Sequence, residues 1–163
     1  MDVYLEGWSD FDVAMMGAAA ALAGLLIVAA SVNIGDIIKA PAVAARLAAG
    51  LAGLVLAIVG AAIGLVPQID PTVYGALAIV AALAAGVFAV QAAKRIFAER
   101  HPANRMRFAK AALGFLAPLG YLVGGILLLA GVSHGVIAFA VGAIAAIVAG
   151  LVISWIALVE ILR

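Results

Sequence analysis

The sequence predicts an all-α transmembrane protein, a five-helix bundle with its N-terminus outside and its C-terminus in the cytoplasm. The first observation is composition: 69% of the residues are hydrophobic and 10% are charged, whereas a soluble domain is about half apolar and a quarter charged. The second is a series of apolar runs that each exceed the ~20 residues needed to cross a hydrocarbon core. The third is the grouping of the basic residues at positions that fall on one side of the membrane.

Five apolar runs meet the length requirement, and short polar segments separate them. The acidic first ten residues differ from the basic start of a signal peptide, so we expect the first run to remain as a span. The expected spans are residues 11–33, 43–66, 71–93, 108–131 and 134–159, which form a single membrane domain over 1–163.

The start of the first span carries two local helix signals. Ser9 and Asp12 have the spacing of a capping box, in which Ser9 is the N-cap. Trp8 and Val13 stand where a hydrophobic staple would lie. After the span, we expect the helix to continue until Pro41 stops it.

The turn between the second and third spans, PQIDP, is predicted to be tight. Asp70 is a favoured N-cap residue, and Pro71 suits the first helical position. The fourth span contains Pro118, which frees the carbonyl of Gly114 and kinks the helix. The fifth span is expected to begin near Ser133 or His134.

A basic cytoplasmic loop over residues 94–107 determines the expected orientation. With five spans, this loop and the adjacent Lys110 share one side with Lys39, Arg46 and the C-terminal Arg163, so that side holds all nine Lys and Arg residues. The positive-inside rule makes it the cytoplasmic side. We expect the cluster to contact anionic lipid headgroups or a partner protein, and nothing beyond its charge favours nucleic acid. Its members are Lys94, Arg95, Arg100, Arg105, Arg107 and Lys110.

The segment GWSDFDVAMMGAAAALAGLLIVAASVN, residues 7–33, resembles the opening of a group of small bacterial integral membrane proteins. In that group an acidic and aromatic N-terminus leads into a GAAAALAGL-type first span. The specific similarity covers about the first 45 residues, and beyond them only the pattern of spans is similar. The resemblance implies a multi-pass protein of the bacterial inner membrane, and it carries over no functional residue.

Three patterns are candidates for chemistry. Gly131 to Gly135 matches the G-x-S-x-G nucleophile pattern around Ser133, but it lies in a turn between membrane helices rather than after a strand. The ordinary alternative is that Ser133 caps the fifth span. A metal site would have to gather scattered side chains from the outer ends of the spans, and their spacing matches no metal motif. These side chains are Asp10, Asp12, Asp70 and His134.

The region around the proline of the fourth span is the best candidate for a pore or cavity, because a kink beside glycines can open a bend. The same residues can equally serve close helix packing. No ionisable residue is expected at membrane depth, which argues against an acid relay for proton transport. The candidate pore residues are Pro118, Gly120, Tyr121 and Gly124.

The expected function is that of a small non-catalytic membrane protein without a cofactor. Glycine and alanine faces suit packing with copies of itself or within a larger assembly, so we expect a homo-oligomer or an accessory component. The main alternative is a channel or facilitator for ions or small solutes, with its path near the Pro118 kink or on an oligomer axis. A third hypothesis is an intramembrane hydrolase that uses Ser133.

Overall fold

The computed structural model describes residues 7–98 and 107–161, and this part of the chain is helical with no strand. Five helices are long and apolar enough to cross a membrane, which indicates a multi-pass membrane protein. A sixth, α3, is a single turn. In chain order the helices are α2 (Ser9–Val32), α3 (Ile34–Ile37), α4 (Pro41–Gly64), α5 (Pro71–Ala98), α6 (Arg107–Leu129) and α7 (Gly135–Ile161).

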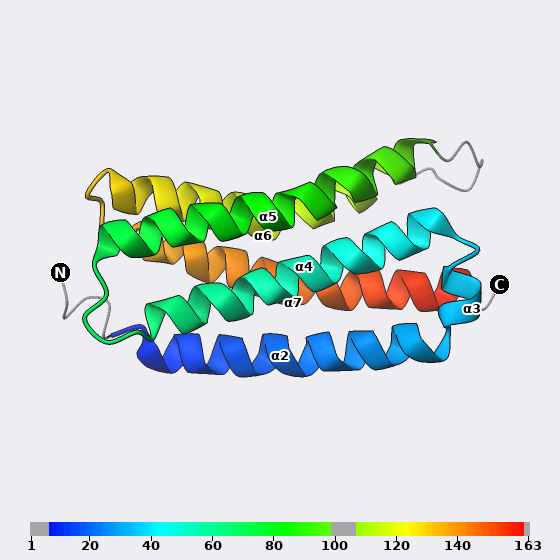
Figure 1. Cartoon of the computed structure of the whole chain (residues 1–163), viewed down its shortest axis with the longest axis horizontal. Coiled ribbons are helices and arrows are strands. Elements are labelled where there is room, and N and C mark those ends of the chain that lie inside the picture. The colour runs from blue at the N-terminus through cyan, green and yellow to red at the C-terminus, as the bar shows by residue number, and fades with distance from the viewer. Residues whose placement is uncertain (1–6, 99–106, 162–163) are drawn as a thin grey trace.

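Helix α4 is the centre of the bundle. It packs against α2, α5, α6 and α7, and α2 and α5 lie on opposite sides of it (Figure 1). Helices α5 and α6 share the most extensive packing contact, and α6 also packs against α7. The turn that contains Asp70 lies at one end of the bundle, which we call the Asp70 end. Lys94 lies near the opposite end, which we call the Lys94 end (Figure 1).

Small residues at the helix contacts explain how five nearly uniform apolar helices pack closely. Ala19, Ala57 and Ala78 are completely buried. Between α6 and α7, a Cβ added at Gly120 would lie 2.7 Å from the Cα of Gly142. Membrane helices gain no hydrophobic advantage from one another over lipid, so such close backbone contacts supply much of their association energy.

The capping box expected at Ser9 is wrong. Ser9 is already helical, Trp8 is the N-cap residue, and no side chain caps this end. The backbone N–H of Asp12 donates to the Trp8 carbonyl at 2.9 Å, which is an ordinary helical bond. The Asp12 carboxylate lies instead against Gly64 of α4, because α4 offers a glycine there.

Of two other predictions about helix ends, one is confirmed and one is wrong. Asp70 is the N-cap of α5, as expected: its Oδ1 accepts hydrogen bonds from the backbone N–H groups of Thr72 at 2.8 Å and Val73 at 3.2 Å. The helix of the first span does not continue to Pro41 but ends at Val32. The Asn33 side chain donates to the Ala29 carbonyl at 2.9 Å there, and α3 forms the connection to α4.

Helices α6 and α7 are joined by a short turn. Helix α6 runs through Pro118 as one helix, and α7 begins at Gly135, next to His134. Gly131 turns the chain between them with a φ of +77°, which favours glycine.

Candidate functional site

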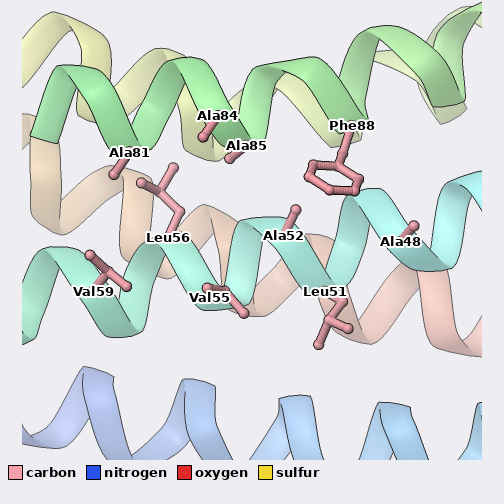
Figure 2. Close-up of a pocket in the computed structure, with 10 residues that line it drawn as sticks. All are labelled: Ala48, Leu51, Ala52, Val55, Leu56, Val59, Ala81, Ala84, Ala85 and Phe88. Atoms are coloured by element: carbon pink, nitrogen blue, oxygen red, sulfur yellow. The ribbon is translucent and has the colours of Figure 1, made fainter.

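An unfilled apolar feature runs along α4 between α2 and α5, and we refer to it as the α4 trough. One part, between α4 and α5, has a volume of about 400 Å³, and Figure 2 shows the ten residues that line it. A second part, between α2, α3 and α4, has a volume of about 260 Å³. Ala48 and Leu51 line both parts, so the two parts are adjacent along α4.

The lining of the trough is apolar except for Ser31, and it combines alanines with larger Leu, Ile, Val and Phe side chains. Alanines from α4 and α5 form its floor, and Val55 of α4 and Phe88 of α5 stand along it with 46% and 44% of their surfaces exposed (Figure 2). Ser31, in the α2 part, donates its hydroxyl hydrogen to the Ile27 carbonyl at 2.8 Å and so is satisfied within its own helix. A helix can therefore approach this floor closely without meeting an unsatisfied polar group.

A second feature is a buried aromatic cluster nearer the Asp70 end. The Tyr121 ring of α6 stacks on Phe139 of α7 with centroids 5.2 Å apart, and Tyr74 of α5 lies 4.9 Å from the same ring. The Tyr74 hydroxyl donates to the Gly60 carbonyl of α4 at 3.1 Å. Residues of α4, α5, α6 and α7 thus meet at this one level.

Asp12 of α2 extends this cluster. A Cβ added at Gly64 would lie 2.7 Å from Asp12 Oδ2 and 2.9 Å from the Tyr74 hydroxyl oxygen. From the sequence, Asp12 was expected in a capping box or among the candidate metal ligands, and its approach to Tyr74 was not predicted. The Gly60/Gly64 pair was the available signal, since it marks where other helices come close to α4.

The candidate pore residues separate into two places. Gly120, Tyr121 and Gly124 all lie against α7, where a Cβ at Gly124 would lie 2.6 Å from the Gly135 carbonyl oxygen. Pro118 is buried and lines a groove between α5 and α6 with a volume of about 470 Å³. A path for ions or solutes through this region stays a prediction.

The described basic residues gather at the Lys94 end of the bundle. Lys94 and Arg95 lie near the end of α5, and Arg107 and Lys110 lie at the start of α6. The Arg107 guanidinium carbon lies 5.4 Å from the Phe108 ring centroid and 5.8 Å from that of Phe97, a cation–π arrangement that links the two helices. Arg100 and Arg105 lie outside the described residues.

Arg46 falls inside the second expected span, 43–66, and the structure places it in a helix. Helix α4 already begins at Pro41, so Arg46 lies in its second turn and is only 6% exposed. The alanine-rich sequence around it gave no signal for where the helix begins other than Pro41 itself.

The other candidates for chemistry remain apart. Among residues 7–98 and 107–161, no three His, Cys, Asp or Glu side chains lie close enough to hold a metal ion. Ser133 and His134 lie in the turn before α7, and the histidine is exposed. Hydrolysis at Ser133 stays a prediction, and His101 lies outside the described residues.

No protein-family model, curated protein or solved structure matches this chain. The fold and the composition of its helices define a class, that of multi-pass α-helical membrane proteins. The similarity of residues 7–33 to small bacterial membrane proteins stays a prediction.

Proposed function

We propose that this protein is a non-catalytic component of a membrane assembly, and that the α4 trough receives a transmembrane helix from a second copy or from another subunit. The two adjacent apolar parts of the trough along the central helix are the observation that carries the proposal. We further propose that the protein resides in the bacterial inner membrane, with its N-terminus outside and the Lys94 end facing the cytoplasm.

The length of the trough favours a helix as its occupant. Its lining on α4 extends from Ala44 to Val59, which corresponds to about 22 Å at 1.5 Å per residue. A hydrocarbon core is about 30 Å thick, so the trough follows most of one span. A helix packed here would keep its contact with α4 through most of the bilayer.

The chemistry of the trough disfavours a small polar substrate. Sites for small molecules combine an apolar wall with a few polar groups that fix orientation. All ten residues that line the α4–α5 part are Ala, Leu, Val or Phe. Small side chains without polar groups are typical of faces where membrane helices pack together.

The distribution of charge supports the proposed orientation. The exposed residues Lys39, Lys94, Arg95 and Arg107 belong to the Lys94 end, while Asp70 lies at the opposite end. Cytoplasmic loops carry the excess of Lys and Arg in multi-pass proteins.

Site-specific cross-linking tests the proposal, because the chain contains no cysteine and each introduced thiol is unique. Val55→Cys places a thiol in the trough, and Val80→Cys places one on the exposed surface of α5 outside the trough lining. Each residue lies nine positions from the end of its helix at the Asp70 end, so depth is matched. A photo-activated cross-linker on the thiol, used in native membranes, should capture a protein from Val55→Cys and not from Val80→Cys.

The identity of the captured band then separates a second copy from another subunit. Equal capture from both positions, or capture from neither, would contradict the proposal that the trough is the assembly surface.

A channel or facilitator is the second candidate function. The groove beside Pro118 and the aromatic cluster around Tyr121 favour it, since both lie on the proline-containing helix α6 and beside glycines of other helices. Solute or ion flux into liposomes that contain the purified protein, changed by Tyr121→Ala, would support this function.

A further inference from the structure

We propose that the groove between α5 and α6 holds one anionic phospholipid of the leaflet at the Lys94 end. In this arrangement the lipid phosphate lies at Lys94 and Gln91, and one acyl chain follows the groove to the level of Pro118. This inference uses the proposed orientation only to name the leaflet as cytoplasmic, and it concerns a different surface from the α4 trough.

The groove is polar at one end and apolar along the rest of its length, as a phospholipid is. Its two polar lining residues, Gln91 and Lys94, lie on successive turns near the end of α5, and both are exposed. The remaining lining is apolar, with Val87 and Val90 on one wall and Leu119 on the other. A cation and an amide donor at one end of an apolar channel match a phosphate attached to an acyl chain.

The length of the groove matches one leaflet. From Lys94 to Ala82 the lining follows α5 for twelve residues, or about 18 Å at 1.5 Å per residue. Half of a 30 Å hydrocarbon core is about 15 Å. A lipid whose phosphate lies at the level of Lys94 would therefore have its acyl chain beside the groove along its whole length.

The charge around the mouth of the groove favours an anionic headgroup over a zwitterionic one. Helices α5 and α6 carry four cations within their bounds and no Asp or Glu. Lys and Arg near a membrane surface attract anionic lipid, and the cation closest to the bound phosphate contributes most. These cations are Lys94, Arg95, Arg107 and Lys110.

The middle of the groove also has empty space beside its lining residues. Gly86 lines it, and a Cβ added at Gly86 would meet no atom within 4 Å. Leucine at this position should therefore fold normally, fill the groove and displace the acyl chain. Gly17 of α2 gives a matched control, because a Cβ there also meets nothing within 4 Å and the residue is absent from the groove lining.

The test is lipid binding to the full-length protein in detergent, measured by native mass spectrometry with dioleoylphosphatidylglycerol and dioleoylphosphatidylcholine as probes. We expect the phosphatidylglycerol to bind more tightly to the unmodified protein. Lys94→Gln should weaken its binding about fivefold, the equivalent of about 1 kcal/mol. Arg95→Gln removes the same charge one residue away, outside the groove lining, and should weaken binding less than twofold.

Gly86→Leu should also weaken phosphatidylglycerol binding at least fivefold, whereas Gly17→Leu should leave it unchanged. Equal effects of Lys94→Gln and Arg95→Gln would overturn the proposal, since they indicate diffuse attraction rather than a site. Unchanged binding in Gly86→Leu would overturn the placement of the acyl chain. Loss of a protein partner in Gly86→Leu would identify the groove as a protein interface instead, while cross-linking from Val55→Cys tests the trough separately.

Discussion

The Asp12 carboxylate and the Tyr74 hydroxyl, from α2 and α5, face the same glycine of α4. A Cβ at that glycine, Gly64, would lie 2.7 Å from Asp12 Oδ2 and 2.9 Å from the Tyr74 oxygen. One turn earlier, Gly60 accepts the hydrogen bond from Tyr74 and packs under Tyr121. This pair of glycines therefore allows side chains from three other helices to reach the face of α4.

Replacing Gly60 with alanine should destabilise the bundle, because the new Cβ would overlap the Tyr121 ring. Forcing extra volume into a packed core typically costs about 1–3 kcal/mol of unfolding free energy. Thermal or denaturant unfolding in detergent measures the loss. Gly17→Ala is the control, since its Cβ meets nothing within 4 Å and a helix-interior alanine gains about 0.5–1 kcal/mol over glycine. A Gly60→Ala protein as stable as Gly17→Ala would contradict the packing described.

Replacing Tyr74 with phenylalanine should lower stability by a smaller amount. The change keeps the ring beside Phe139 and removes only the hydroxyl that donates to the Gly60 carbonyl at 3.1 Å. Hydrogen bonds between membrane helices contribute about 0.6 kcal/mol on average and about 1.7 kcal/mol at most. The same unfolding assay should show a loss in that range. A gain in stability would mean that the hydroxyl is poorly accommodated.

The sequence predicted correctly those features that depend on residues close together in the chain, such as the start of α5. Asp70 and Pro71 act within one turn of each other, so their roles at the start of α5 were predictable. The five long helices followed from length and hydropathy alone. Ser9 and Asp12 carry an equally good local signal, yet the structure places the Asp12 carboxylate against α4. A tertiary contact there prevailed over a local cap.

The α4 trough could not be predicted from the sequence for a different reason. A helix that is apolar on every side gives no periodic pattern to show which face meets protein and which meets lipid. Ala52 and Ala84 line the trough while Ala57 and Ala78 are completely buried, and the sequence does not distinguish these two pairs. The neighbours of each helix decide its faces, and those neighbours come only from the folded arrangement.

The Asp70 cap should make stability depend on pH in the acidic range. The hydrogen bonds to the backbone N–H of Val73 and to Thr72 lower the pKa of Asp70 below its ordinary value of 3.8. A lowered folded-state pKa means that the ionised cap stabilises α5 fully above about pH 3.8, and that this contribution is lost as the pH falls through the folded pKa. Asp70→Asn should keep the cap and remove this part of the pH dependence, as measured by melting temperature from pH 7 down to pH 2. An unchanged acid profile in Asp70→Asn would show that other carboxylates account for it.

Filling the trough should dissociate the proposed assembly without unfolding the chain. Ala84 lines the trough on α5 and is exposed, so a leucine there extends into the space where a partner helix would lie. Ala76 is an exposed alanine on the same helix outside the trough lining, and Ala76→Leu is the matched control. Native mass spectrometry of protein extracted from membranes should show a lower assembled fraction for Ala84→Leu and an unchanged fraction for Ala76→Leu. Both variants should melt at the temperature of the unmodified protein, because neither side chain enters the core. If Ala84→Leu retained the full assembly, the partner helix would have to pack on another face of the bundle.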